Sequence, residues 1–366
     1  MIKILNVAGA RPNFMKVEPL VHEMNRHADV VHKLVHTGQH YDVMMSKVFF
    51  DELGIPAPDV NLEVGGGERL AVIERIMTRF DPIVRSERPD AVLVVGDVNS
   101  TIACARVARE HGVKVVHVEA GLRSFDPAMP EELNRVETDR ISDFLFVTEP
   151  AGMKNIANER LEGRAYLVGN VMIDTLVAQL QRAREMEVYK RFGLEPGRYV
   201  VATFHRPSNV DDPEALKAVV DIIQHTCAQR PMVLPVHPRT RQALVRFGFN
   251  ECLGRIEALR LTEPLGYLEF LSLVSESAAV VTDSGGIQEE TTYLKIPCVT
   301  MRENTERPIT VDVGSNVLAG TRPETVKLHI DAALQNGAAK KAAVPELWDG
   351  RAAVRIVGHL REEISS

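Results

Sequence analysis

The sequence predicts an α/β protein built from two Rossmann-like, doubly wound parallel-sheet domains. Its 366 residues exceed what one hydrophobic core usually covers. Short, nearly continuous Val/Ile/Leu runs recur along the chain, as expected for strands covered on both faces. Helical patterns lie between these runs, which is the rhythm of βαβ units. The runs expected to form strands are IKILNVAG (2–9), AVLVVGD (91–97), VKVVHVEAG (113–121), DFLFVTE (143–149), AYLVGN (165–170), YVVATFHR (199–206), MVLPVHP (232–238), IEALRL (256–261), AAVVTDSGG (278–286) and IPCVTM (296–301).

The helical patterns include STIACARVAREHG (100–112) and the segment 211–230, which opens with Asp-Asp-Pro, a good cap and first-turn signal. A polar helical stretch and a Gly/Pro turn (172–198) separate the two strand series. We therefore expect a first domain over 1–172 and a second over 173–349. The last stretch, RAAVRIVGHLREEISS, is an amphipathic helix.

Composition narrows the function classes. The net charge of −7 argues against a general nucleic-acid or membrane-surface binder. The four cysteines are scattered without a CxxC pair, so buried, reduced thiols are expected instead of a disulfide framework or zinc site. The start MIKILNVAGARP lacks the features of a leader, and no apolar run is long enough to span a membrane, so a cytoplasmic location is expected.

Charged residues follow several predicted strands of the first half. Arg11 and Lys16 flank a predicted helix start, where backbone N–H groups favour an anion, although two surface cations on a turn would look the same. Asp97 and Glu119 each follow an apolar strand, where a carboxylate needs a partner or a purpose. Pairing of Glu119 with Arg123 is the structural alternative, and proton transfer is the catalytic one.

Three residues follow second-half strands in a similar way. His205 with Arg206 is suited to a phosphate or to a leaving group that gains negative charge, and so is His237. A structural role at the strand end is the alternative. The histidines are widely separated and have no HxxxH pattern or carboxylate triad, so we expect no metal.

The stretch TDSGGIQEE (282–290) predicts a strand, a turn and a helix. Ser284, Gly285 and Gly286 offer donors to a diphosphate. Glu290 lies roughly 9 Å farther along the helix, at a distance that suits the hydroxyls of a ribose. A nucleoside diphosphate would satisfy both groups, and Arg307 either faces the same anion or caps a loop. The alternative is a capped helix with an acidic first turn.

Taken together, the motifs resemble those of the non-hydrolysing UDP-N-acetylglucosamine 2-epimerase family along nearly the whole chain. The matching stretches are GARPNFMK, TGQH (37–40), GDVNST, HVEAGLR, PEELNR, GNVMID, HRPSN, VHP, TDSGGIQEE and TERP. The resemblance implies a glycosyltransferase-B-like pair of domains with the active site between them, a terminal helix (350–366) packed on the first domain, a homodimer, a UDP-sugar substrate and no cofactor.

The reaction that the resemblance implies is inversion at C2 of UDP-GlcNAc to give UDP-ManNAc, through elimination of UDP and its re-addition to a glycal. Asp97, Glu119 and Glu131 match the catalytic carboxylates, with Asp97 and Glu131 expected nearest to proton transfer. Glu131 also stands in a predicted first helical turn, where acids are common for dipole reasons. The residues matched or expected around the diphosphate and sugar are Arg11, Lys16, Gln39, His40, His205, Arg206, His237, Ser284, Gly285, Gly286, Glu290 and Arg307.

The chain also departs from the pattern of many bacterial members. It has Asn13 where they have Glu, and Pro207-Ser208 where they have Arg-Glu. Asp42, Gly67 and Glu68 replace residues of the bacterial activator site, which puts activation by substrate in doubt. Relatives acting on diacetamido-uronates share GARP and HRP, so an epimerase of that type, a sugar transferase and a catalytically silent nucleotide-sugar sensor stand as alternatives.

Overall fold

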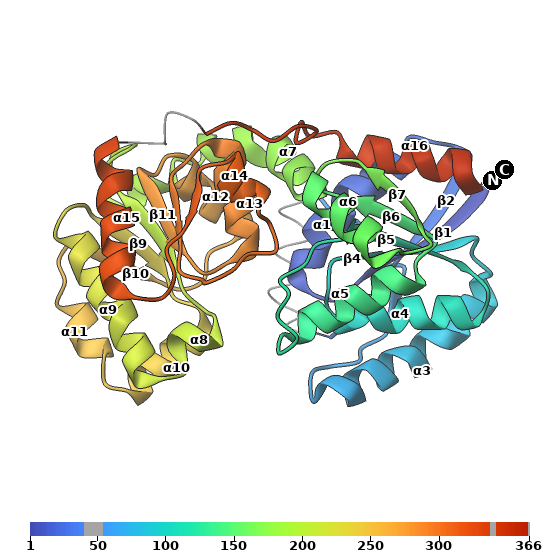
Figure 1. Ribbon diagram of the computed structural model, residues 1–366, viewed down its shortest axis with the longest axis horizontal. Helices are drawn as coiled ribbons and strands as arrows, with labels where there is room; N and C mark the ends of the chain where they lie inside the picture. Colours follow the sequence, from blue (N-terminus) through green and yellow to red (C-terminus); the bar gives the residue numbers. More distant parts are fainter. Residues whose placement is uncertain (40–53, 337–341, 365–366) are drawn as a thin grey trace. The chain divides into compact units, whose positions relative to one another are not determined.

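The structure, a computed structural model, describes residues 1–39, 54–336 and 342–364. The chain forms two compact units, each with its own parallel sheet (Figure 1). The first comprises Met1–Val177 and Glu346–Ser366, and the second comprises Ala178–Pro345. The predicted class, two doubly wound α/β domains with parallel sheets, is confirmed.

Within the described residues, the first unit holds a seven-stranded sheet in the order β3-β2-β1-β4-β5-β6-β7, with all neighbours parallel. The chain order of strands reverses between β1 and β4, which is where ligands collect in open α/β sheets. Val95 of β4 pairs with Val118 of β5, so the residues that follow these two strands come out at the same sheet edge. The strands are β1 (Ile2–Ala8), β2 (Val30–His36), β3 (Val60–Asn61), β4 (Ala91–Val95), β5 (Lys114–Ala120), β6 (Phe144–Val147) and β7 (Arg164–Leu167).

Helices cover both faces of this sheet. A hydrophobic core, including Phe80 and Ile102, fills the space between the sheet and α3 and α4, whereas α1 and α16 pack together on the opposite side (Figure 1). The helices are α1 (Arg11–Met24), α3 (Arg69–Glu87), α4 (Asn99–Glu110), α5 (Pro130–Ile141), α6 (Pro150–Glu159) and α16 (Ala352–Ile364), and α7 (Val171–Glu185) runs from this unit into the second.

The C-terminal segment completes the first unit. Asp174 accepts hydrogen bonds from the backbone N–H groups of Ala352 (3.1 Å) and Ala353 (2.7 Å) and so caps the start of α16. The indole of Trp348, which is 1% exposed, donates to the Thr148 carbonyl at 3.1 Å. These buried contacts join residues 178 to 200 positions apart in the chain.

In the second unit the described strands form a six-stranded parallel sheet in the order β10-β9-β8-β11-β12-β13. The predicted cap before Pro213 is confirmed, because Asp212 accepts from the N–H groups of Glu214 and Ala215 at 2.9 and 3.0 Å. The strands are β8 (Val200–Thr203), β9 (Met232–Pro235), β10 (Leu259–Thr262), β11 (Ala279–Thr282), β12 (Cys298–Thr300) and β13 (Asn316–Leu318). The helices are η1 (Val188–Phe192), α8 (Pro207–Val210), α9 (Pro213–Cys227), α10 (Pro238–Arg246), α11 (Asn250–Gly254), α12 (Tyr267–Ser275), α13 (Gly285–Leu294), α14 (Ile309–Asp312) and α15 (Pro323–Asn336).

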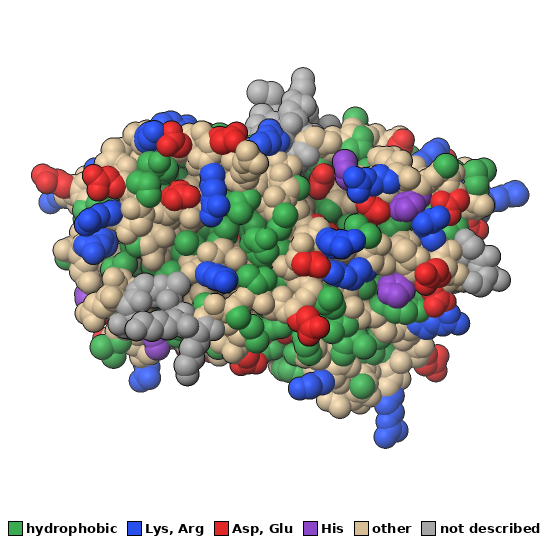
Figure 2. Space-filling model, turned by 90° about the horizontal axis from the view of Figure 1, so that it is seen from above, with side chains coloured by type: hydrophobic (Ala, Val, Ile, Leu, Met, Phe, Trp, Pro, Cys, Tyr) green, Lys and Arg blue, Asp and Glu red, His purple; other side chains and the backbone are tan. Residues whose placement is uncertain are grey.

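The surface and the thiols agree with the composition. Basic and acidic side chains are interspersed over the face seen in Figure 2. Cys104, Cys227 and Cys298 are free and buried, and Cys252 is free and partly exposed. Among the described residues, no helix is both long and apolar enough to cross a bilayer.

Candidate functional site

In the first unit, the loops after β1 and β4 lie in close contact. A Cβ added to Gly9 would lie 2.1 Å from the Ser100 hydroxyl, so only glycine fits there. Asn13 accepts from the N–H of Ala10 at 2.9 Å and donates to the Val95 carbonyl at 3.1 Å. The departure at Asn13 thus has a structural role: it ties the start of α1 to the end of β4.

Lys16 and Glu119 form a buried ion pair beside Gly96. The exposed fractions of the two residues are 8% and 2%. A Cβ at Gly96 would lie 3.1 Å from Lys16 Nζ and 3.3 Å from a Glu119 carboxylate oxygen, so the loop after β4 packs directly against the pair. Pairing of Glu119 with Arg123, the structural alternative drawn from sequence, is wrong, because Arg123 instead binds Asp139 and Glu159.

The Asp97 side chain, 26% exposed, forms an ion pair with Arg135 of α5. Arg135 also pairs with Glu132 at 2.5 Å, and its own side chain is only 2% exposed. Asn134 donates to the Asp97 carbonyl at 2.9 Å. Helix α5 therefore holds both the backbone and the carboxylate of Asp97, a role that the sequence reasoning did not assign to Arg135.

The two neighbouring acids at the start of α5 have different surroundings. Glu132 is buried and accepts from the N–H and hydroxyl of Ser124, both at 2.9 Å, and from the N–H of Phe125 at 3.1 Å. Glu131 is exposed and makes no hydrogen bond or ion pair within the part of the chain that the structure describes. Glu132 thus anchors the loop after β5, while Glu131 faces solvent.

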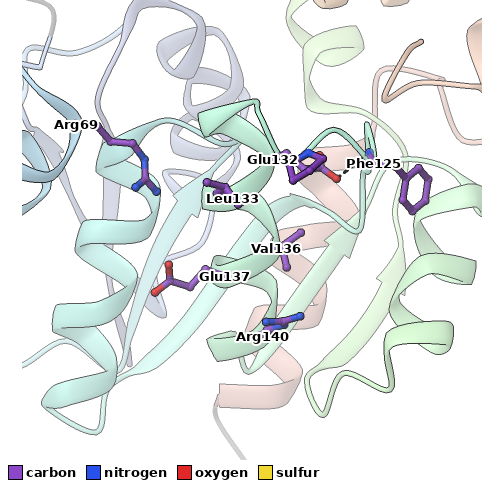
Figure 3. A pocket seen from close by; sticks show the side chains of 8 residues that line it. Arg69, Phe125, Glu132, Leu133, Val136, Glu137 and Arg140 are labelled. Carbon is purple, nitrogen blue, oxygen red and sulfur yellow. Dashed lines mark hydrogen bonds between the residues drawn. The ribbon is translucent and has the colours of Figure 1, made fainter.

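A pocket of about 560 Å³ lies along α5 (Figure 3). It combines apolar side chains such as Leu133 and Val136 with charged ones. Of the charged residues discussed so far, its lining includes only Glu132. Asp97, Glu119 and Lys16 do not line this pocket, so it is separate from the Asp97–Arg135 and Lys16–Glu119 ion pairs. Its lining residues are Arg69, Phe125, Pro127, Glu132, Leu133, Val136, Glu137 and Arg140.

Of the other residues predicted from sequence, some are described by the structure and others are not. Gln39 is 9% exposed and accepts from the Ser100 hydroxyl at 2.9 Å. His40 and Asp42 lie outside the described residues, as does the side chain of Arg11, the first residue of α1. Glu68 caps α3 by accepting from the N–H of Ala71 at 3.1 Å, and Gly67 has a φ of 140°.

In the second unit, Asp283 is the centre of a hydrogen-bond network. Its carboxylate accepts from the backbone N–H groups of His205 and Arg206 at 3.0 and 2.9 Å and from Asn209 Nδ2 at 3.1 Å. Burial favours its neutral form, but His205, the Arg206 backbone and Asn209 together lower the pKa of Asp283. The sequence reasoning did not list Asp283, which positions two residues that it did list.

The start of α13 has the features of an anion site. Ser284 precedes the helix, and its side chain makes no capping hydrogen bond among the described residues. A Cβ at Gly285 would lie only 2.7 Å from Arg307 Nη1, so the absence of a side chain lets this guanidinium reach the helix start. A Cβ added at Gly286 would point into open space. Orphan N–H groups, the helix dipole and a guanidinium together favour a phosphate.

A buried charged cluster supports Arg307. Its Nε lies 2.7 Å from Glu289, and Arg302 binds Glu306 at 2.9 Å. Burial opposes ionisation of Glu306, but Arg307 and Arg302 hold the pKa of that carboxyl well below its usual range. Arg206 lies 3.7 Å from Glu306, which places three guanidinium groups around two carboxylates.

Glu290 and His237 occupy contrasting places. Glu290 is 4% exposed, and burial raises its pKa to about 7. The hydrogen bond from Tyr267 lowers this pKa, and the charge of Glu289 raises it. His237 is exposed, accepts from the Arg239 N–H at 3.2 Å as the cap of α10, and has its ring 5.5 Å from that of His205. Burial, followed by the charge of His205, lowers the pKa of His237.

These features fit a two-domain Rossmann-type enzyme, with acids at the strand ends of one sheet and a candidate anion site beside the other. Within this class, residues 22–361 match the model of the UDP-N-acetylglucosamine 2-epimerase family. The chain belongs to that family. Its glycosyltransferase-B-like fold, expected from the resemblance, agrees with the solved structures of relatives.

Particular relatives are similar over most of their length. A Methanococcus maripaludis UDP-N-acetylglucosamine 2-epimerase is 40% identical over 342 residues, 92% of this chain and 93% of the relative. A Pseudomonas aeruginosa UDP-2,3-diacetamido-2,3-dideoxy-D-glucuronate 2-epimerase is 39% identical over 330 residues, 89% of this chain and 90% of the relative. The crystal structure of Methanocaldococcus jannaschii UDP-GlcNAc 2-epimerase with UDP-GlcNAc and UDP has a TM-score of 0.89 and 36% identity, covering 98% of this chain and 100% of that one.

Proposed function

We propose that this protein interconverts UDP-GlcNAc and UDP-ManNAc by inverting C2 of the sugar. The observation that carries the proposal is the match over 98% of the chain to a relative whose structure contains UDP-GlcNAc and UDP. The alternative of a sugar transferase needs no set of first-unit acids, and a silent sensor would not retain Asp97 and Glu119 in held positions.

The second unit is proposed to bind the UDP moiety. The diphosphate would meet the start of α13 at Ser284, Gly285 and Gly286, with Arg307 beside it. His205 and Arg206, both fixed by Asp283, add donors that stabilise the departing diphosphate as negative charge develops. Glu290 is proposed to hold the ribose hydroxyls, and His237 lies next to His205.

The first unit is proposed to supply the acids and bases. In the elimination step a base removes the C2 proton, the C1–O bond breaks, and UDP leaves with the bonding electrons to give a glycal. In the return step UDP adds back at C1 while an acid protonates C2 on the other face. Asp97 and Glu131 are proposed nearest to these proton transfers, because Asp97 is partly accessible and Glu131 is exposed.

Glu119 is proposed to support positive charge that develops at C1, as a carboxylate does in glycosidases. Its ion pair with Lys16 fixes this carboxylate beside Gly96. Arg11, Gln39 and His40 are proposed to contact the substrate on the strength of the family motif alone.

The reaction is tested by incubating the purified protein with UDP-GlcNAc in deuterated water and following C2 by proton NMR. We expect deuterium at C2 and a manno product. An unchanged sugar would reject this substrate.

UDP-2,3-diacetamido-2,3-dideoxy-glucuronate is the second candidate substrate. The Pseudomonas aeruginosa enzyme named for it is 39% identical to this chain, close to the 40% of the Methanococcus relative. The same NMR assay with this sugar as a parallel substrate separates the two, since the ratio of their kcat/KM values identifies the preferred one.

We further propose that the protein acts as a homodimer in the cytoplasm, as the family resemblance implies. Sedimentation equilibrium measures the mass in solution, and fractionation of the source cells measures the location. A monomer mass of 40.6 kDa would reject the first proposal.

A further inference from the structure

A buried charged network contacts the backbone next to Asp97 and Glu119 in the first unit. His117 of β5 and Asp139 of α5 are both 0% exposed, and His117 Nδ1 lies 2.7 Å from an Asp139 oxygen. The other ring nitrogen, Nε2, lies 2.8 Å from the Gly96 carbonyl oxygen. Arg123 binds the second Asp139 oxygen at 2.6 Å. None of these contacts was expected from the sequence.

The partners of the ring determine where its protons are. A carbonyl oxygen can only accept, so Nε2 must carry a proton to bond Gly96. Asp139 accepts from Arg123 and from the Gly121 N–H at 3.0 Å on its other oxygen, as an ionised carboxylate does. Nδ1 must therefore also donate, and the ring carries a proton on each nitrogen.

Arg123 has a second carboxylate partner. It grips Glu159 with two hydrogen bonds, at 2.7 and 2.9 Å, and Glu159 is exposed. In the interior, the side chains of Arg123 and His117 both contact Asp139. Burial opposes ionisation of Asp139, but the hydrogen bonds and charges of His117 and Arg123 lower its pKa.

The network makes hydrogen bonds to the backbone beside two proposed catalytic acids, Asp97 and Glu119. Gly96, which accepts from His117, precedes Asp97, and its own N–H donates to the Val118 carbonyl at 3.0 Å. Glu119 stands between His117 and Gly121, at an irregularity of the sheet, with a φ of 72° that is unusual for a residue other than glycine. Asp139 holds the N–H of Gly121, just beyond this strained position.

We propose that His117, held as a doubly protonated ring between Asp139 and Gly96, is a positioning residue that sets the places of Asp97 and Glu119. The proposal rests on the proposed epimerase function for its effect on turnover. The protonation of His117 is independent of that function.

The first experiment is NMR of the full-length protein labelled with ¹⁵N-histidine. The chain has 12 histidines, and the His117 signals are those missing in His117→Gln. We expect the His117 signals to show a proton on each ring nitrogen at the pH of the activity assay. A single ring proton on His117 at that pH would overturn the proposal.

The second experiment compares turnover and binding. His117→Leu removes both hydrogen bonds and is expected to lower kcat about 10- to 100-fold, as loss of supporting contacts behind reactive groups does. His117→Gln, which keeps a donor, is expected to be partly rescued. The Kd for UDP should be unchanged. The matched control is His111→Gln, whose ring pairs with Asp81 at 2.7 Å at a partly exposed position.

The outcomes separate three cases. A kcat for His117→Leu equal to that of the control rejects positioning. A loss of UDP affinity in step with kcat indicates general unfolding and also rejects it. If the wild type turns over neither sugar, the proposed function fails, while the NMR result still decides the state of His117. Should His117→Leu fail to fold, the wild-type spectrum and His117→Gln give the decision.

Discussion

The fully buried carboxylate of Asp283 lies 2.8 Å from Nδ1 of His205, whose side chain is 38% exposed. A buried carboxylate that engages Nδ1 fixes the orientation of the imidazole and leaves Nε2 to meet a ligand. The same carboxylate binds two successive backbone N–H groups, so the loop and the ring are positioned together. This relationship explains why an aspartate precedes the Ser-Gly-Gly turn, where its negative charge would otherwise disfavour a phosphate.

Asp283→Asn is expected to weaken UDP binding about tenfold, or about 1.4 kcal/mol, because the neutral amide holds His205 less firmly than the carboxylate does. Calorimetric titration with UDP measures this change. Asp211→Asn, which breaks an exposed pair with Arg239 (2.8 and 2.6 Å), is the control and should bind UDP normally. Equal affinity in both variants would contradict the proposed role.

The adjacent acids of α5 should respond differently to removal of their charge. Glu131→Gln is expected to lower kcat at least tenfold while leaving the melting temperature unchanged, since the residue is exposed. Glu132→Gln is expected to destabilise the fold by about 1–3 kcal/mol, because it loosens a buried Arg135 pair and the Ser124 contacts. Thermal unfolding and initial rates test both. A stable, active Glu131→Gln would exclude Glu131 from proton transfer.

Gly285→Ala is expected to raise the Kd for UDP about tenfold, because the new methyl group would lie 2.7 Å from Arg307 Nη1 and displace the guanidinium. Gly254→Ala in α11 is the matched control, since its Cβ would meet no atom within 4 Å. Fluorescence competition with UDP provides the measurement. Unchanged affinity in Gly285→Ala would mean that Arg307 does not bind the diphosphate.

Stability should fall as the pH rises toward neutrality, because of two acids near the start of α16. Burial, with the charge of Asp174, raises the pKa of Glu18 from 4.5 to about 7, and burial raises that of Asp174 from 3.8 to about 6. A folded-state pKa above the unfolded value gives stability that is full below the unfolded value and lost as pH rises through the folded one.

Glu18→Gln should therefore remove part of the loss of stability between about pH 5 and pH 8. At pH 8 the melting temperature should rise by about 2–4 °C for each 1 kcal/mol gained in the free energy of unfolding. Calorimetry across this pH range gives the result. The exposed Glu110→Gln serves as control, and identical pH profiles for the two variants would rule out Glu18.

Most central strands could be predicted from sequence, and three strands, two of them at sheet edges, could not. The apolar runs located β1, β4, β5 and their counterparts because these strands are buried on both faces. β2 was not expected, since His32 and Lys33 interrupt its apolar pattern near the sheet edge. β3 and β13, of two and three residues, are too short to give a periodic signal and form only by pairing with a neighbour.

The sequence predicted individual residues of the candidate site, but not which residues pair with them. The end of a buried strand identified Asp97 and Glu119, because a carboxylate there must be used or neutralised. Asp97 follows β4 as expected, whereas Glu119 lies within β5, one residue before its end. Their partners come from other elements: Lys16 is 103 residues from Glu119, and Arg135 is 38 from Asp97. Asp283 was overlooked because its role depends on a backbone that lies 78 residues earlier in the chain.

The first unit is assembled from two separate pieces of chain, with 178–345 inserted between them. A ribosome delivers these pieces in order, so the helix capped by Asp174 emerges only after the whole second unit has been synthesised. Domains usually fold in the order of their synthesis. Since the first unit lacks its last helix until synthesis ends, we expect the second unit to reach its native structure first.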